Sequence, residues 1–357
     1  MFSRRTLVLA PFLAAFVLGF IFLRGPTPHI SIKAEEITTA GPVGITNTMI
    51  TSWIVTALLI VVVFLSTRRW ELVPKGVQNV IEAIVEGFYG LVVSIAGEKN
   101  GRKFFPVVAT IFFFILAANW LSLLPIFNVI GKVEPGDSGF VMHSTSIAGL
   151  KVDYAGLSGL GHLSSDSIDA GDANATDQAN TARGQGKVVG DLSPYLRGPN
   201  TDLNTTAALA IISAIAVESW GIAAAGVLGY GRNFIRLRGM LSGIFSLSPA
   251  KFFEGFIDAF VGFLELVSEL VRLLSFSARL FGNMIAGEIV ILMFTFMAPL
   301  FVGIIFYAFE LFVGIIQAFI FATLTVIFGM MAISHGEHAH ESPGHAVSET
   351  EPIELAA

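Results

Sequence analysis

The chain has 357 residues, of which 54% are hydrophobic and 13% are charged, and its formal net charge at pH 7 is -6. Soluble domains carry roughly twice this density of charge, so the composition excludes an ordinary water-soluble domain. The acidic balance provides no basic surface for nucleic acid, and the lack of cysteine excludes disulfide bonds and thiolate chemistry. With a mean hydropathy of +0.74 and several long apolar runs, the chain is predicted to be a polytopic membrane protein.

The first region, residues 1–44, contains an apolar run at residues 6–23 that follows two arginines. This run is just long enough to cross a bilayer, so it forms either a retained membrane helix or the apolar core of a signal peptide. We expect a retained helix followed by an external segment, because no small-residue cleavage site comes after the run.

The region 45–130 is predicted to hold two spans with an interfacial helix between them. The apolar run 45–65 is followed by two arginines, which place that end in the cytoplasm. Residues 74–97 place polar side chains every four positions among apolar ones, which indicates a helix lying in the membrane interface. Three basic residues then precede the apolar run 104–127, so this second span leads outward again.

The next two regions are a polar segment and a further span. Residues 131–200 are rich in Gly, Ser and Asp and are expected to form a long external loop that is partly disordered. In the region 201–251, the apolar run 205–230 leads inward and is followed by basic residues that mark the cytoplasmic side.

The region 252–334 has one convincing helix break, at Ala298 and Pro299. It is therefore predicted to form two helices of about 70 Å and about 50 Å, joined as an antiparallel hairpin. Because the hydrocarbon core is about 30 Å thick, both helices must bend or tilt strongly. The His-rich tail 335–357 matches no fixed ligand spacing, so we expect a solvated cytoplasmic segment, no metal site and no cofactor.

A polar stripe runs along the first helix of this hairpin. Its members recur at spacings of three, four and seven residues and fall within a narrow sector of the helix. They are Glu254, Asp258, Glu265, Glu269, Arg272, Ser275, Arg279 and Asn283. Arg279 differs from the others because it lies near the centre of an apolar stretch and its guanidinium stays protonated at any relevant pH. A permanent charge at membrane depth indicates an ion pathway or a structural ion pair.

Two glutamates are predicted to meet across the hairpin. The antiparallel fold brings Glu288 opposite Glu310 and, about two turns further inward, Arg279 opposite Gln317. Two adjacent carboxyls cannot both ionise easily, so the glutamates are predicted to share a proton, with two isolated protonated glutamates as the alternative. Glu218, inside the inward-running span, either approaches a cytoplasmic exit or is a buried hydrogen-bonded group.

Residues 275–290, SFSARLFGNMIAGEIV, closely resemble the signature of subunit a of rotary ATP synthases, with Arg279 at the position of that family's essential arginine. Four further segments support the resemblance. They are VPKGVQNVIEAIVEG, FFPVVATIFFFILAANWLSLLP, GPNTDLNTTAALA and IIQAFIFATLTVIFGMMA. Together the matches cover nearly all of residues 45–334, and the amino-terminal helix, the segment 131–200 and the tail are departures from the family pattern.

The resemblance implies an all-α polytopic membrane protein with upright spans, an interfacial helix and a long tilted hairpin. It implies a stator subunit beside a ring of c subunits, with two aqueous half-channels for protons. By position, Arg279 would separate the half-channels, Asn283 and Gln317 would flank it, and Ser275 would also belong to the pathway.

The same resemblance assigns the ends of the pathway. Glu288 and Glu310 would line the external half-channel, where many relatives carry histidine at one of the two positions. Asp202 and Asn204 resemble polar residues near its external mouth, and Glu218 is a further candidate for a mouth of the pathway.

The implied protein is a proton-conducting subunit without catalytic activity of its own. Its implied partners are the c ring, the b subunits of the peripheral stalk, the remainder of the ATP synthase and the lipid of a bacterial plasma membrane, with the carboxyl terminus in the cytoplasm. The main alternative is a self-contained secondary transporter, which would usually show a repeated half with matching broken helices, and the sequence shows none. A membrane enzyme is a weaker alternative, because all seven histidines lie outside the apolar runs.

Overall fold

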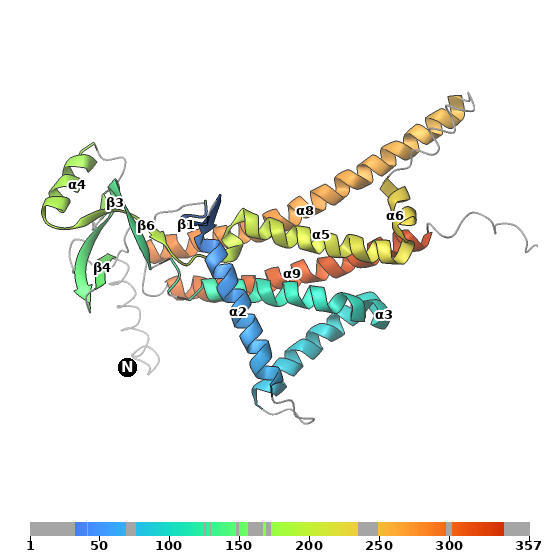
Figure 1. The fold of residues 1–357 in the computed structure, drawn as a ribbon, viewed down its shortest axis with the longest axis horizontal. Coiled ribbons are helices and arrows are strands. Elements are labelled where there is room, and N and C mark those ends of the chain that lie inside the picture. Colours follow the sequence, from blue (N-terminus) through green and yellow to red (C-terminus); the bar gives the residue numbers. More distant parts are fainter. Residues whose placement is uncertain are drawn as a thin grey trace, which may run out of the picture. The chain divides into compact units, whose positions relative to one another are not determined.

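The structure is a computed structural model that describes most of the chain. The described residues are 33–40, 42–68, 76–124, 126–128, 130–147, 150–155, 167–168, 173–234, 249–297 and 302–338. The predicted amino-terminal helix, the hairpin break at residues 298–299 and most of the tail lie outside them. The described part is mostly helical (Figure 1). It contains four helices that are long and apolar enough to cross a membrane. This confirms the predicted all-α class of polytopic membrane protein.

The chain divides into two compact units. The first unit contains the described parts of residues 1–81, 111–209 and 276–320, and the second contains those of residues 82–110, 210–275 and 321–357. Several long helices have residues in both units, so the limits of the units fall within helices.

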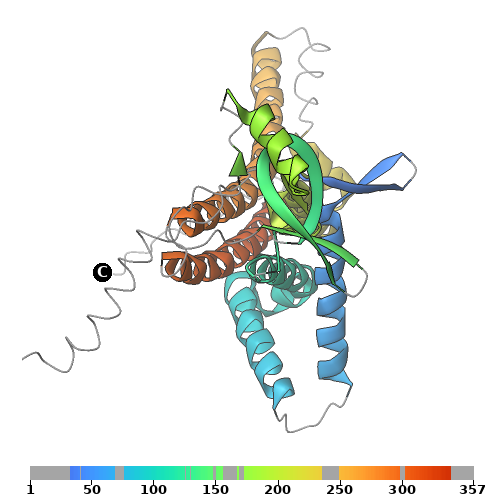
Figure 2. The ribbon, with the colours of Figure 1, turned by 90° about the vertical axis from the view of Figure 1, so that its left-hand side faces the viewer.

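The first described span is α2 (Asn47–Thr67), which belongs to the first unit. An antiparallel hairpin of β1 (Glu36–Ala40) and β2 (Val43–Thr46) leads directly into it (Figure 2). Thr46 caps the helix, because its hydroxyl accepts a hydrogen bond of 3.3 Å from the backbone N–H of Met49. The buried residues of α2 all lie near its start, and they are Asn47, Thr48, Thr51 and Val55. Most of this apolar helix is therefore free to contact lipid.

Helix α3 (Val77–Ser122) joins the predicted interfacial helix to the second span. Gly97 separates the two arms, since its φ of 71° and ψ of 163° interrupt the helix in a conformation that favours glycine. Near this bend, the ring of Tyr89 meets that of Phe105 edge to face, with 5.1 Å between the ring centroids. The bend is visible in Figure 1. The two predicted elements are therefore two arms of one bent helix.

The segment 131–200, called the insertion below, contains a folded β-sheet, contrary to the predicted loop. Its elements are β3 (Gly131–Ile147), β4 (Leu150–Ala155), β5 (Ser167–Ile168), α4 (Ala175–Gly184) and β6 (Val188–Pro194). The long strand β3 pairs antiparallel with each of the other three strands. The polar composition suggested disorder, but tertiary pairing of the strands decides the fold here.

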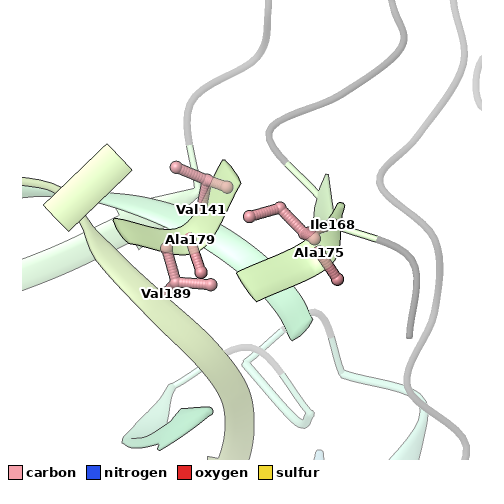
Figure 3. Packing of buried hydrophobic residues seen from close by; sticks show 5 residues of the cluster. All are labelled: Val141, Ile168, Ala175, Ala179 and Val189. Carbon is pink, nitrogen blue, oxygen red and sulfur yellow. The ribbon is translucent and has the colours of Figure 1, made fainter. Parts of the chain in front are cut away.

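A small apolar cluster stabilises the insertion. Helix α4 packs on the sheet, and the side chains that meet there are small or β-branched (Figure 3). They are Val141, Ile168, Ala175, Ala179 and Val189. Burial of five modest side chains is enough to hold one short helix on a sheet, which is why the sequence shows no strong apolar period in this region.

The third span is α5 (Leu203–Ala225), which the short helix η1 (Pro199–Thr201) precedes. Gly226, with a φ of 74°, ends α5 and lets the chain turn into α6 (Val227–Phe234). In the second unit, the ring of Tyr230 packs so closely on Gly221 that a side chain at Gly221 would collide with it.

The long hairpin consists of α8 (Pro249–Met297) and α9 (Val302–His338). Their 49 and 37 residues correspond to about 74 Å and about 56 Å of helix, close to the predicted lengths. In the first unit, the rings of Phe294 and Phe306 stack with 4.0 Å between their centroids, which joins the two helices near the end of the hairpin.

Candidate functional site

A cavity of about 180 Å³ lies in the first unit, between α8, α9 and the chain segments that flank the insertion. Glu288 of α8 and Glu310 of α9 both line it. Three further lining residues lie near the two ends of the segment 131–200, namely Asn128, Gly198 and Thr201. The two glutamates that the sequence places opposite each other across the hairpin therefore line the same cavity.

Two glycines define the register of α8 and α9 around this cavity. A side chain at Gly287 would overlap the carboxyl group of Glu310, so that carboxyl lies directly over the backbone of α8. Further along, a Cβ at Gly303 would come within 3.6 Å of the hydroxyl of Thr295, which is an ordinary contact. The pairing of positions is that of the predicted antiparallel hairpin.

Glu288 is bound at both carboxylate oxygens. The side-chain amide of Asn128 donates a hydrogen bond of 2.9 Å to Oε1, and Nη2 of Arg197 donates one of 3.2 Å to Oε2. Arg197 and Glu288 form a salt bridge in which both side chains are mostly shielded from solvent. This arrangement differs from the predicted proton shared with Glu310, because a residue 91 positions away supplies a cation instead.

Glu310 has a different environment from Glu288. Its side chain is 4% exposed, and among the described residues its Oε1 has no hydrogen-bond partner. No hydrogen bond joins it to Glu288 within the described part of the chain. The cavity therefore holds one glutamate that is bound by a cation and an amide, and one whose carboxyl oxygen remains available.

Arg279 lies on the exposed side of α8, together with Ser275, Ala278 and Gly282. The neighbouring Leu280 is buried, so this face of the helix points away from the unit's own core. Among residues 249–297 and the rest of the described chain, no carboxylate pairs with Arg279. An exposed guanidinium surrounded by small side chains is accessible to a group from outside this chain.

Asn283 and Gln317 are less exposed than Arg279. Asn283 is half-buried on α8, and Gln317 of α9 is 8% exposed. If the register seen at Gly287 continues inward by two turns, Gln317 lies level with Arg279, as the sequence predicts.

Asp202 and Asn204 do not line the cavity, although their neighbour Thr201 does. Asp202 is buried, accepts a hydrogen bond of 2.8 Å from the hydroxyl of Thr48 on α2, and accepts another of 2.9 Å from the backbone N–H of Asn204. It therefore caps the start of α5 and ties this helix to α2. Asn204 is exposed.

The second unit contains a separate polar group around Glu218. Burial, followed by a hydrogen bond with Glu218, raises the pKa of Tyr230, so the phenol stays protonated and donates to that carboxylate. The other oxygen of Glu218 is buried, and no hydrogen-bond partner for it is found in the described residues. Nearby on α8, Arg272 pairs with Glu269 at 2.8 Å and lies 3.9 Å from the centre of the Phe328 ring.

Sequence reasoning missed both donors to Glu288, which are Asn128 and Arg197. Arg197 lies at the end of a segment that is predicted to be a loop, and no helical period or spacing connects it to Glu288. Its burial next to Gly198 and Pro199 became evident only from the structure.

The chain matches the family model described as ATP synthase A chain over residues 49–329. The chain belongs to the ATP synthase A chain family. It is 28% identical to ATP synthase subunit a of Moorella thermoacetica over 309 residues, which cover 87% of this chain and 99% of that protein. It is 30% identical to ATP synthase subunit a of Gloeobacter violaceus over 304 residues, which cover 84% and 89% of the two chains.

A third relative, ATP synthase subunit a 1 of Pelobacter propionicus, is 28% identical over 277 residues, or 78% of this chain and 83% of that protein. As a member of the ATP synthase A chain family, the chain is a non-catalytic proton-channel subunit of the ATP synthase complex. Its spans and its bacterial relatives place it in a bacterial plasma membrane as a multi-pass protein.

Proposed function

We propose that this subunit forms two proton half-channels beside a ring of c subunits and couples the passage of protons to rotation of that ring. The outward-facing Arg279 is the observation that carries the proposal. A permanent cation on a helix that is predicted to tilt through the membrane needs an anionic partner, and the described part of this chain provides none. Ring carboxylates that pass in turn would serve as that partner when deprotonated.

The exposed face around Arg279 supports close contact with a rotating partner. Ser275, Ala278 and Gly282 have small side chains, so another helix can approach the backbone of α8 there without large steric barriers. Asn283 and Gln317 flank the arginine and supply neutral polar groups that can bind water or a ring carboxyl. A fixed positive charge at this position would block direct leakage of protons between the half-channels.

The cavity with Glu288 and Glu310 is assigned to the external half-channel. Its support is a polar wall at the insertion, a free volume of about 180 Å³ and a carboxyl oxygen that has no partner. Thr201 lines the cavity next to Asp202 and Asn204, which is consistent with a mouth near these residues.

Glu218 is assigned to the opposite, cytoplasmic half-channel. The predicted inward direction of α5 would bring Glu218 toward that side, and one of its oxygens is buried without a partner among the described residues. On this topology the carboxyl terminus is cytoplasmic, and the b subunits of the peripheral stalk hold the subunit against the torque of the ring.

The central test replaces Arg279 by Gln in the complete ATP synthase. In membrane vesicles, Arg279→Gln is expected to reduce gradient-driven ATP synthesis and ATP-driven proton pumping to background, because the cation that separates the half-channels is lost. ATP hydrolysis by the soluble head should continue. Arg183→Gln is the matched control, since Arg183 pairs with Asp137 on the exposed insertion. Normal coupling in Arg279→Gln would contradict the proposal.

A further inference from the structure

The insertion is connected to the cavity at both of its ends. Asn128 precedes β3 and Arg197 follows β6. The antiparallel pairing of these strands reaches their ends, where Gly131 stands opposite Pro194. It then continues beyond the strands, because the N–H of Tyr195 donates to the carbonyl of Ile130 at 2.9 Å.

The last hydrogen bond of this antiparallel pairing joins the N–H of Asn128 to the carbonyl of Leu196, at 3.1 Å. Asn128 is thereby held beside the residue that precedes Arg197. Their side chains then bind the two different oxygens of Glu288. The paired ends of the insertion, called its base below, thus present two donors to a single carboxylate. Asn128 comes from one end and Arg197 from the other.

Further contacts hold the segment that carries Arg197 in place. On one side, the buried amide of Asn47 donates to the carbonyl of Pro194 at 3.0 Å. On the other side, Asn200 donates to the side chain of Asn119 on α3 at 2.6 Å, and both of these residues are buried. Such a braced backbone leaves the guanidinium little freedom to leave Glu288.

We propose that Arg197 is a positioning residue for proton uptake, which holds Glu288 with Asn128 as a fixed anion of the cavity wall and leaves Glu310 as the carboxyl that exchanges protons with cavity water. The proposal rests on the proposed function of the cavity as the external half-channel. It also gives the insertion a role, because its paired base places both donors.

The geometry of the two carboxyls supports this division. Both oxygens of Glu288 are occupied, one of them by a permanent cation. Glu310 has a buried oxygen without a partner among the described residues, and its carboxyl lies over Gly287, where no side chain intervenes. A group that takes up and releases protons must exchange partners, and Glu310 meets that condition better than Glu288.

The test measures ATP-driven proton pumping in vesicles that contain the complete ATP synthase. Arg197→Gln is expected to lower pumping by about tenfold or more, because it leaves the anion of Glu288 buried without its cation. Arg197→Lys keeps the charge but loses the planar guanidinium, so its proton pumping should lie between that of Arg197→Gln and that of the unmodified protein. Immunoblots of the vesicles check that each variant is present at normal levels.

A double variant separates positioning from a general structural role. In a Glu288→Gln background, Arg197→Gln should lower pumping by no more than about threefold further, because the unpaired charge has been removed. If Arg197→Gln does not assemble, Arg197→Lys and the double variant still carry this comparison. Pumping that is unchanged in Arg197→Gln, or a double variant as poor as the Arg197 single variant, would overturn the inference.

The matched control is Arg183→Gln, the same chemical change elsewhere in the insertion. Arg183 is partly exposed and pairs with the exposed Asp137, so pumping should not change. Failure of this inference can be told apart from failure of the proposed function. If Arg279→Gln abolishes coupling while Arg197→Gln does nothing, only the role of Arg197 is wrong.

Discussion

The cavity of the first unit and the cluster of polar residues around Glu218 in the second unit both contain glutamates that lie in long helices. The cations that pair with these glutamates come from different parts of the chain. In the cavity, Glu288 receives its cation from Arg197, which is 91 positions away at the end of the insertion. In the second unit, Glu269 receives its cation from Arg272, three residues along the same helix. One ion pair depends on the fold of a distant segment, and the other needs only a formed helix.

The two sites also differ in what surrounds the glutamate that has an unpartnered carboxyl oxygen. Glu310 has no cation bound to it in the described structure and lines a cavity, whereas the phenol of Tyr230 binds the carboxylate of Glu218. Proton exchange requires both a free acceptor and space for water. The comparison therefore predicts larger functional effects in the first unit than in the second.

The largest effect is expected for Glu310→Gln. A neutral amide cannot carry a proton between cavity water and the ring, so pumping should fall by about 100-fold or more. Glu218→Gln is the comparison variant in the second unit, and a reduction of only a few-fold is expected because the phenol of Tyr230 already binds its carboxylate. ATP-driven quenching of a pH-sensitive dye in vesicles measures both. Equal losses in the two variants would remove the proposed difference between the sites.

Gly287→Ala should have the next largest effect. The added methyl group would overlap the carboxyl at the end of the Glu310 side chain, so this carboxyl must shift, and pumping should fall by about tenfold while stability changes little. Gly303→Ala is the matched control in the same hairpin, because its methyl group would make only an ordinary contact with Thr295. Proton pumping should distinguish the pair, and equal pumping in the two variants would contradict the described packing.

A smaller effect is expected for Tyr230→Phe in the second unit. The change removes the hydrogen bond to Glu218 while keeping the ring that packs on Gly221, so stability should fall by about 1 kcal/mol. Proton pumping should fall less than in Gly287→Ala. The midpoint of thermal unfolding of the complex tests this, and a loss of pumping as large as that of Glu310→Gln would show that the second site is as important as the cavity.

The smallest functional effect is expected for Val189→Ala in the core of the insertion. Loss of two buried methyl groups should destabilise the sheet by about 1–2 kcal/mol, yet the backbone ladder at its base stays intact. Limited proteolysis of the insertion should become faster while pumping stays near normal. A large loss of pumping would mean that the distal sheet, as well as its base, positions Arg197.

Local patterns were sufficient for much of the fold and part of the site. The long apolar runs predicted α2, the second arm of α3 and α5, because a helix that crosses lipid needs about 20 apolar residues in sequence. Helical periodicity and the break near Pro299 predicted that Glu288 approaches Glu310, because antiparallel register follows from a constant rise per residue.

Local patterns were not sufficient for the insertion. Its strands are short or polar, and its core of small side chains leaves no clear period, so composition indicated a partly disordered loop where the structure has a sheet. For the same reason, the donors Asn128 and Arg197 were not connected with Glu288.

The amino-acid sequence by itself determined the membrane class, the spans, the family signature around Arg279 and the pairing across the hairpin, because each of these depends on neighbouring residues or on regular helical geometry. Only the tertiary structure decided that Arg279 faces outward, that the insertion folds, and that Arg197 binds Glu288 and leaves Glu310 without a cation. These outcomes depend on which distant segments meet and which face of a helix they cover, and no spacing along one chain segment specifies that contact.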